Sequence, residues 1–180
     1  METQNKTRKT LIYLAQAAII AALYTALTIA AASVNLAYGA VQFRFSEALT
    51  ILPALTAAAI PGLTVGCLLS NWIGVSMGLT GPVDILFGTA ATLLAAICSY
   101  LTRNVKFKGL PWLSSLFPVV FNAVIVGFEI TLFFTDEHTL VAFLTNAALV
   151  GLGQLVCCVG GGLPLYAALN KSRVFSRLQA

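Results

Sequence analysis

Charged residues are scarce in this chain. Only 9% of its 180 residues are Asp, Glu, Lys or Arg, whereas 59% are hydrophobic. A soluble domain carries about 25% charged residues, and a chain of this length cannot bury so much apolar surface in its own core. The excess must face lipid. Long apolar runs such as 15–32 show no period-two alternation, which excludes a transmembrane β-barrel. The composition therefore predicts an all-α integral membrane protein.

Residues for metal or nucleophilic chemistry are also scarce. The single histidine, His138, follows two acidic residues in a polar stretch. The apolar segments therefore lack the histidine that a buried Ser–His pair or a metal site would need. The cysteines lie in apolar runs without zinc-like spacing, and we expect reduced packing residues: Cys67, Cys98, Cys157 and Cys158. We expect no metal, no cofactor and no enzyme activity. The sequence has no GxxxxGK[ST] loop, the motif that binds the phosphates of ATP. Any ATP-driven process would therefore depend on ATP hydrolysis by another subunit.

Breaker residues divide the chain into six apolar segments. A spanning helix needs about 20 mostly apolar residues, and the segments lie at 11–32, 46–59, 63–77, 83–102, 111–134 and 139–169. We expect one domain over 1–180, a bundle of six transmembrane helices with cytoplasmic tails at 1–10 and 170–180. The second and third segments are short and could form a re-entrant pair, and the sixth could be broken near Gly160–Pro164. The first segment is long and lacks a clear cleavage site, which argues against a cleavable signal peptide.

The basic residues gather in three clusters. These are Lys6, Arg8 and Lys9; then Arg103, Lys106 and Lys108; then Lys171, Arg173 and Arg177. With six helices, every cluster falls on one side of the membrane, as the positive-inside rule requires. We therefore expect both termini in the cytoplasm. The net charge of +4 reflects this topology and does not indicate nucleic-acid binding.

Several polar residues lie within or beside the apolar segments. A charged side chain there costs at least ~2.5–3.5 kcal/mol on insertion scales, so it is a functional-site hypothesis by default. The charged members are Arg44, Glu47, Asp84 and Glu129, and the uncharged ones are Asn71, Asn122, Asn146 and Gln154. Glu47, Asn71, Asp84, Glu129 and Asn146 fall in the outer half of the membrane. This placement indicates a pocket open to the outside, because an ion relay would need polar groups throughout the bilayer.

Each of these residues also has a structural explanation. Glu47 and Asp84 lie in first helical turns, where an acid meets the helix dipole favourably. Arg44 could snorkel to the interface or pair with Glu47, and the amides could join neighbouring helices through hydrogen bonds. Glu129 has apolar neighbours and is the hardest to explain structurally, unless it pairs with Arg44.

The mixture of side chains suggests a ligand class. Carboxylates accept paired N–H donors from a planar heterocycle, and aromatic rings stack on its faces; the aromatic candidates are Tyr38, Phe43, Phe45 and Trp72. A net acidic pocket also suits a ligand that carries an amine. These features favour a nucleobase-like molecule.

The first helix carries a face of small residues. Ala17, Ala18, Ala21, Ala22 and Ala26 form small-xxx-small pairs, which let another helix approach closely. This face could dock a partner subunit or pack within the bundle.

Four segments carry a family resemblance. They are 40–50 (AVQFRFSEALT), 60–71 (IPGLTVGCLLSN), 84–89 (DILFGT) and 122–129 (NAVIVGFE). Over roughly residues 10–170 the chain resembles the QueT family, substrate-binding (S) components of energy-coupling factor (ECF) transporters. The resemblance implies uptake of a queuosine precursor: 7-aminomethyl-7-deazaguanine, 7-cyano-7-deazaguanine or queuine. It also implies a bacterial plasma-membrane location and assembly with a transmembrane coupling subunit and two ATPase subunits.

The resemblance also implies roles for particular residues. The expected ligand contacts are Arg44, Glu47, Asn71, Asp84, Glu129 and Asn146, with Gln154 deeper, and with Phe43, Phe45 or Trp72 stacking. The alanine face of the first helix would contact the coupling subunit. Alternatives are an S component for another vitamin or nucleobase, or a stand-alone secondary transporter. The latter is disfavoured because the sequence shows no inverted repeat and no charged path across the membrane.

Overall fold

The computed structural model describes residues 2–38 and 41–172, which form helical segments joined by short connections. In chain order they are α1 (Glu2–Ser33), η1 (Phe45–Ala54), α2 (Ala59–Ser76), α3 (Val83–Leu101), α4 (Trp112–Phe133), α5 (Leu140–Gln154), η2 (Leu155–Gly161) and α6 (Gly162–Ser172). No strand occurs within this part of the chain. The all-α prediction is confirmed for it.

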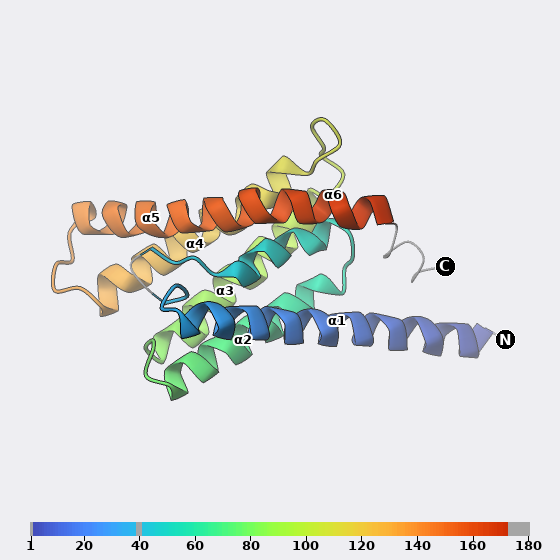
Figure 1. Cartoon of the computed structure of the whole chain (residues 1–180), viewed down its shortest axis with the longest axis horizontal. Coiled ribbons are helices and arrows are strands. Elements are labelled where there is room, and N and C mark those ends of the chain that lie inside the picture. Colours follow the sequence, from blue (N-terminus) through green and yellow to red (C-terminus); the bar gives the residue numbers. More distant parts are fainter. Residues whose placement is uncertain (1, 39–40, 173–180) are drawn as a thin grey trace.

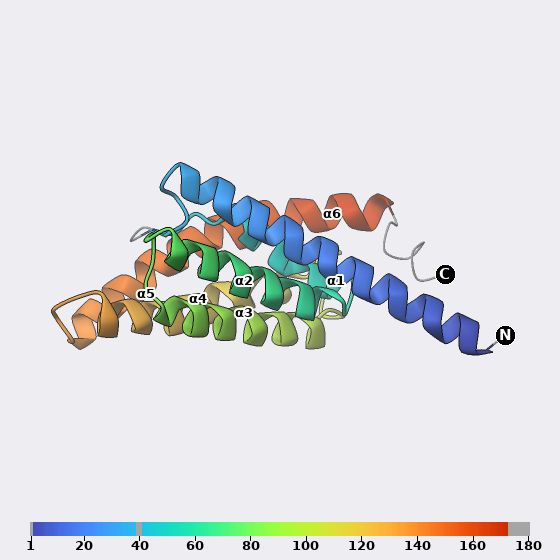
Figure 2. The same cartoon turned by 90° about the horizontal axis from the view of Figure 1, so that it is seen from below.

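The elements run back and forth along one long axis (Figures 1 and 2). The start of α1, the α3–α4 connection and the end of α6 lie at one end of the bundle, called here the basic end. The segment after α1, the α2–α3 turn and the α4–α5 connection lie at the other, called here the loop end. Two of the basic clusters and Lys171 of the third thus belong to elements at one end, whereas Arg173 and Arg177 lie outside the described residues.

Among the residues that the structure describes, five helices are long and apolar enough to cross a membrane: Lys6–Ser33, Ala59–Ser76, Val83–Leu101, Trp112–Phe133 and Leu140–Ser172. These match five of the six predicted spans. The segment expected as an N-terminal tail continues α1, which is helical from Glu2.

The second predicted span differs from expectation. Residues 46–59 were expected to form a membrane-spanning helix, but η1 is a 3₁₀-helix of ten residues. At about 2.0 Å per residue it extends for about 20 Å, short of the about 30 Å hydrocarbon core. Pro53 lies inside η1, and a proline lacks the N–H that an α-helix would need there.

The short helix η1 occupies the centre of the bundle. It packs against α1, α2, α3, α4, η2 and α6, and it runs between the long helices in Figure 1. Seven of its ten residues are buried, and they include Ser46, Glu47 and Thr50. Its polar groups are therefore surrounded by protein, which is where irregular backbone is tolerated at membrane depth.

The last predicted helix does not break at its glycines. The chain continues from α5 into α6 through the π-helical segment η2, residues Leu155–Gly161. Short π-helical segments inside α-helices widen one turn, and they occur frequently at functional sites. Here the widened turn packs against η1.

Small residues bring α1 and α2 together. A Cβ atom on Gly66 would lie 2.8 Å from the Cβ of Tyr24 and 2.9 Å from the carbonyl oxygen of Ala21. A Cβ on Gly62 would meet the carbonyl of Ala17 at 2.8 Å. The two helices can approach this closely because neither glycine carries a side chain.

A hydrogen bond to the backbone carbonyl that Pro118 leaves without its helical partner joins α4 to α3. The proline ring removes the N–H that would bond the carbonyl of Ser114, four residues earlier. The hydroxyl of Ser99 on α3 donates to that carbonyl instead, at 2.8 Å. Asn122 donates to the Pro118 carbonyl at 2.9 Å, so its polar side chain is satisfied within its own helix.

Candidate functional site

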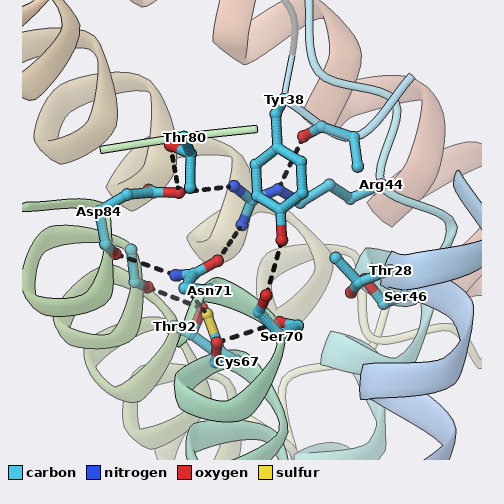
Figure 3. A network of polar contacts seen from close by, with 12 residues as sticks. Thr28, Tyr38, Arg44, Ser46, Cys67, Ser70, Asn71, Thr80, Asp84 and Thr92 are labelled. Atoms are coloured by element: carbon cyan, nitrogen blue, oxygen red, sulfur yellow. Dashed lines mark hydrogen bonds and ion pairs between the residues drawn. The ribbon is translucent and has the colours of Figure 1, made fainter. Parts of the chain in front are cut away.

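Arg44 is the centre of a buried polar network at the loop end (Figure 3). It precedes η1 and is 3% exposed. Its Nε donates to the Ala37 carbonyl at 3.0 Å, Nη1 donates to Asn71 Oδ1 at 3.3 Å, and Nη2 pairs with Asp84 Oδ2 at 3.3 Å. The side chain therefore joins the segment after α1 to α2 and α3. We call Arg44, Asn71 and Asp84 the arginine cluster.

The two acceptors of this cluster are themselves held in place. Asn71 Nδ2 donates to the Asp84 backbone carbonyl at 2.9 Å, and the Thr80 hydroxyl donates to Asp84 Oδ2 at 3.1 Å. A Cβ on Gly88 would lie 2.7 Å from Asn71 Nδ2 and 3.1 Å from Asp84 Oδ1. The glycine one turn after Asp84 thus leaves the space that the two side chains occupy.

Tyr38 covers the arginine cluster. Its ring lies over the Arg44 guanidinium, 4.8 Å from Cζ to centroid, and its hydroxyl donates to the Ser70 carbonyl at 2.8 Å. The same residue lines a half-open pocket of about 200 Å³ with Ala32, Asn35 and Leu79. The Tyr38 side chain therefore lies between that pocket and Arg44.

Arg44 remains charged in this environment. Its burial opposes the charged form, but the nearby Asp84 carboxylate favours it, and on balance the pKa of Arg44 is raised. From the sequence, Glu47 and Glu129 were considered as ion-pair partners of Arg44. Neither of them forms an ion pair with it. The positive charge is already matched by Asp84.

Glu47 lies on η1 and is 1% exposed. Its Oε1 accepts a hydrogen bond of 2.5 Å from the Tyr24 hydroxyl on α1. Its Oε2 is buried and receives no hydrogen bond from any residue that the structure describes. One oxygen is thus fixed by the protein, and the other is open to a donor.

Glu129 lies on α4, four residues before its end, and is also 1% exposed. Both of its carboxylate oxygens are buried without a partner among the described residues. An isolated buried carboxylate is among the most costly groups in a protein interior. η1, which carries Glu47, packs against α4, which carries Glu129, so the two carboxylates lie on neighbouring elements of the bundle.

The remaining amide candidates have internal partners. Asn146 is half-buried, and its Nδ2 donates to the Thr131 hydroxyl at 2.9 Å, which joins α5 to α4. Gln154 is buried, and its Oε1 accepts from the Cys158 thiol at 3.3 Å.

Two of the three predicted stacking residues lie away from the buried carboxylates. Phe45 is 49% exposed and Trp72 is 63% exposed, so both face outward from the bundle. Each is adjacent in sequence to a buried polar residue, and successive residues on a helix point about 100° apart, so the neighbour of a buried residue can face outward. Phe43 is half-buried, whereas Tyr38 is the aromatic residue in contact with Arg44.

The alanine face of α1 divides into two parts. Ala21 is buried and Ala17 half-buried against α2, at the glycines described above. Ala18, Ala22 and Ala26 are exposed at four-residue spacing. One part packs within the bundle, and the other is free to face lipid or another subunit.

Sequence reasoning missed Tyr24 and Thr28. Both are fully buried on α1, and the Thr28 hydroxyl donates to Ser46 Oγ at 2.7 Å. With Gln16, which accepts from the Thr56 hydroxyl at 2.9 Å, they form a polar line at spacings of eight and four residues. That helical spacing is visible in the sequence and could have identified the face of α1 that holds η1.

Membrane-spanning helices around a buried polar centre define a multi-pass helical membrane protein. A family model described as QueT transporter matches residues 14–171. The chain belongs to the QueT transporter family.

A curated relative supports this assignment. The Queuosine precursor transporter QueT of Lactococcus lactis subsp. cremoris (strain MG1363) is 35% identical to this chain over 77 residues. The aligned segment covers 43% of this chain and 43% of the relative. No solved structure matches the chain.

Proposed function

We propose that this protein captures a queuosine precursor, a 7-deazaguanine base, as the S component of an ECF-type importer in a bacterial plasma membrane. It binds the base from outside, at the loop end, and takes no part in chemical conversion. A separate coupling subunit and two ATPase subunits supply the energy. The family membership and the name of the curated relative support the substrate class.

The observation that carries the proposal is Glu129. A carboxylate with two buried, unpartnered oxygens is costly unless a ligand supplies donors. The paired ring and exocyclic N–H groups of a guanine-like edge match a carboxylate in a two-point contact. Glu129 lies four residues before the end of α4, towards the loop end, which faces outside in this proposal.

The residues expected to bind ligand take distinct roles in this proposal. Glu129 and Glu47 contact the base, because they hold the unpartnered carboxylate oxygens of the described chain. Arg44, Asn71 and Asp84 form the supporting wall, since they are bonded to one another. Asn146 supports α4 from α5, and Tyr38 and Phe43 replace Phe45 and Trp72 as candidates for stacking.

The test is titration of the purified protein in detergent with 7-aminomethyl- and 7-cyano-7-deazaguanine, with guanine and thiamine as comparison ligands. We expect tight binding of a deazaguanine. Glu129→Gln should weaken it by about tenfold to a hundredfold, the range for a charge-assisted hydrogen bond. The matched control is Glu137→Gln, the same change at an exposed position in the α4–α5 connection, which should leave affinity unchanged.

The outcomes separate the alternatives. Absence of deazaguanine binding by a folded, monodisperse sample would refute the substrate assignment, and other vitamins would then be screened. Ion-gradient-driven uptake by the chain alone in vesicles would instead establish a secondary transporter.

We assign partner docking to the exposed part of the alanine face. Ala18, Ala22 and Ala26 lie on one side of α1 without cover from the described chain, and small residues permit close helix contact. In the same proposal the basic end faces the cytoplasm, because its connections carry the lysine and arginine clusters.

A further inference from the structure

Three carboxylate oxygens in the bundle interior lack a hydrogen-bond donor among the residues that the structure describes. They are Oε1 and Oε2 of Glu129 and Oε2 of Glu47. Their arrangement differs, since Glu129 offers a complete carboxylate and Glu47 offers one oxygen. The difference has a single cause: the Tyr24 hydroxyl occupies Oε1 of Glu47 at 2.5 Å. A ligand for both residues needs a two-donor edge for Glu129 and a separate single donor for Glu47.

The charges of this region are also unequal. Glu47, Asp84 and Glu129 are acidic, and Arg44 forms its ion pair with Asp84. Arg44 is bonded to Asp84, Asn71 and the Ala37 carbonyl, and within the described chain neither Glu47 nor Glu129 accepts a hydrogen bond from it. The positive charge that Glu47 and Glu129 lack must therefore come from a proton or from the ligand.

We propose that the site selects a base carrying an aliphatic ammonium group, and that Glu47, positioned by Tyr24, binds this ammonium while Glu129 binds the guanine-like edge. The inference rests on the proposed function and adds the charge of the ligand to it. An ammonium is a compact point charge that needs one acceptor oxygen, whereas a planar two-donor edge needs both oxygens of a carboxylate. A nitrile in the same position offers neither a donor nor a charge.

Tyr24 is a positioning residue in this scheme. It is fully buried on α1, and the close contact with Gly66 of α2 holds its backbone in place. Four residues later, Thr28 bonds Ser46 at 2.7 Å, so α1 anchors two consecutive residues of η1. The Glu47 carboxylate is thereby held with Oε2 as its free oxygen.

The experiment compares the affinities of the purified full chain for 7-aminomethyl-7-deazaguanine and 7-cyano-7-deazaguanine. We expect the wild-type protein to prefer the aminomethyl base by about tenfold to a hundredfold. Glu47→Gln should bring the two affinities within about threefold of each other, because the charged acceptor is lost. Glu129→Gln should weaken both bases and keep the preference.

The role of Tyr24 is tested by the ratio of the affinities for the aminomethyl and the cyano base. Tyr24→Phe should reduce the preference, since Glu47 is no longer oriented, whereas a merely structural effect would weaken both bases equally. The matched control is Tyr166→Phe, which removes a buried hydroxyl that has no partner in the described chain and should leave the ratio unchanged.

The results distinguish this inference from the function on which it rests. Equal wild-type affinities, or a preference for the cyano base, would overturn the inference while the deazaguanine assignment stands. Absence of binding by both bases would overturn the two together. If Glu47→Gln does not fold, the wild-type ratio and Tyr24→Phe still decide the matter.

Discussion

Asp84→Asn tests whether the arginine cluster holds the bundle together. The substitution keeps the size of the side chain and the backbone carbonyl that accepts from Asn71, but it removes the charge opposite Arg44. Removing one partner of a buried ion pair costs about 3–5 kcal/mol, because the other charge stays buried without compensation.

The structure places the expected cost at the lower end of that range. Arg44 keeps the Ala37 carbonyl and Asn71 Oδ1 as acceptors, and its contact with Asp84 is long at 3.3 Å. We therefore expect a loss of about 3 kcal/mol, or about two powers of ten in the folding equilibrium.

The assay is equilibrium unfolding by SDS in mixed micelles, followed by circular dichroism. Asp136→Asn, the same change in the exposed α4–α5 connection, is the matched control and should have no effect. The double variant Arg44→Gln/Asp84→Asn should lose less than the sum of the single variants, since no unpaired charge remains. A change below about 0.5 kcal/mol for Asp84→Asn, the range typical of surface substitutions, would refute the reasoning.

Two further predictions concern α1. Gly66→Ala places a Cβ 2.8 Å from that of Tyr24, and we expect a loss of about 1–3 kcal/mol from overpacking; Gly160→Ala, with nothing within 4 Å of the added atom, should be neutral in the same unfolding assay. Ala22→Trp, on the exposed face, should abolish co-purification with the coupling subunit and leave ligand affinity unchanged, whereas Ala21→Trp should destabilise the isolated protein. Normal co-purification of Ala22→Trp would contradict the docking proposal.

The sequence predicted the long helices well because their signals are local. Apolar length and breaker residues mark boundaries that agree with the structure within two residues for α3 and α4. It failed at η1, where the apolar composition is compatible with either a spanning helix or a buried 3₁₀-helix. Only the surrounding helices, which bury η1 on several sides, decide between them.

The candidate site was predicted in part. The buried polar residues identified from the sequence include Arg44, Glu47, Asp84 and Glu129, because a charge in an apolar segment is conspicuous. Their pairing was not predictable: the sequence suggested Glu47 or Glu129 as the partner of Arg44, and Arg44 bonds to Asp84 instead, 40 residues away.

The sequence by itself determined that this is a helical membrane protein with basic clusters towards one end and polar residues within its apolar segments, since composition and helix length follow from side-chain chemistry alone. The tertiary structure decided which carboxylates are left open. Asp84 is neutralised by Arg44 and Glu47 is half-occupied by Tyr24, while Glu129 has no described donor. Hydrogen bonds join particular atoms a few ångströms apart, and such distances between residues far apart in the chain exist only once the helices have packed.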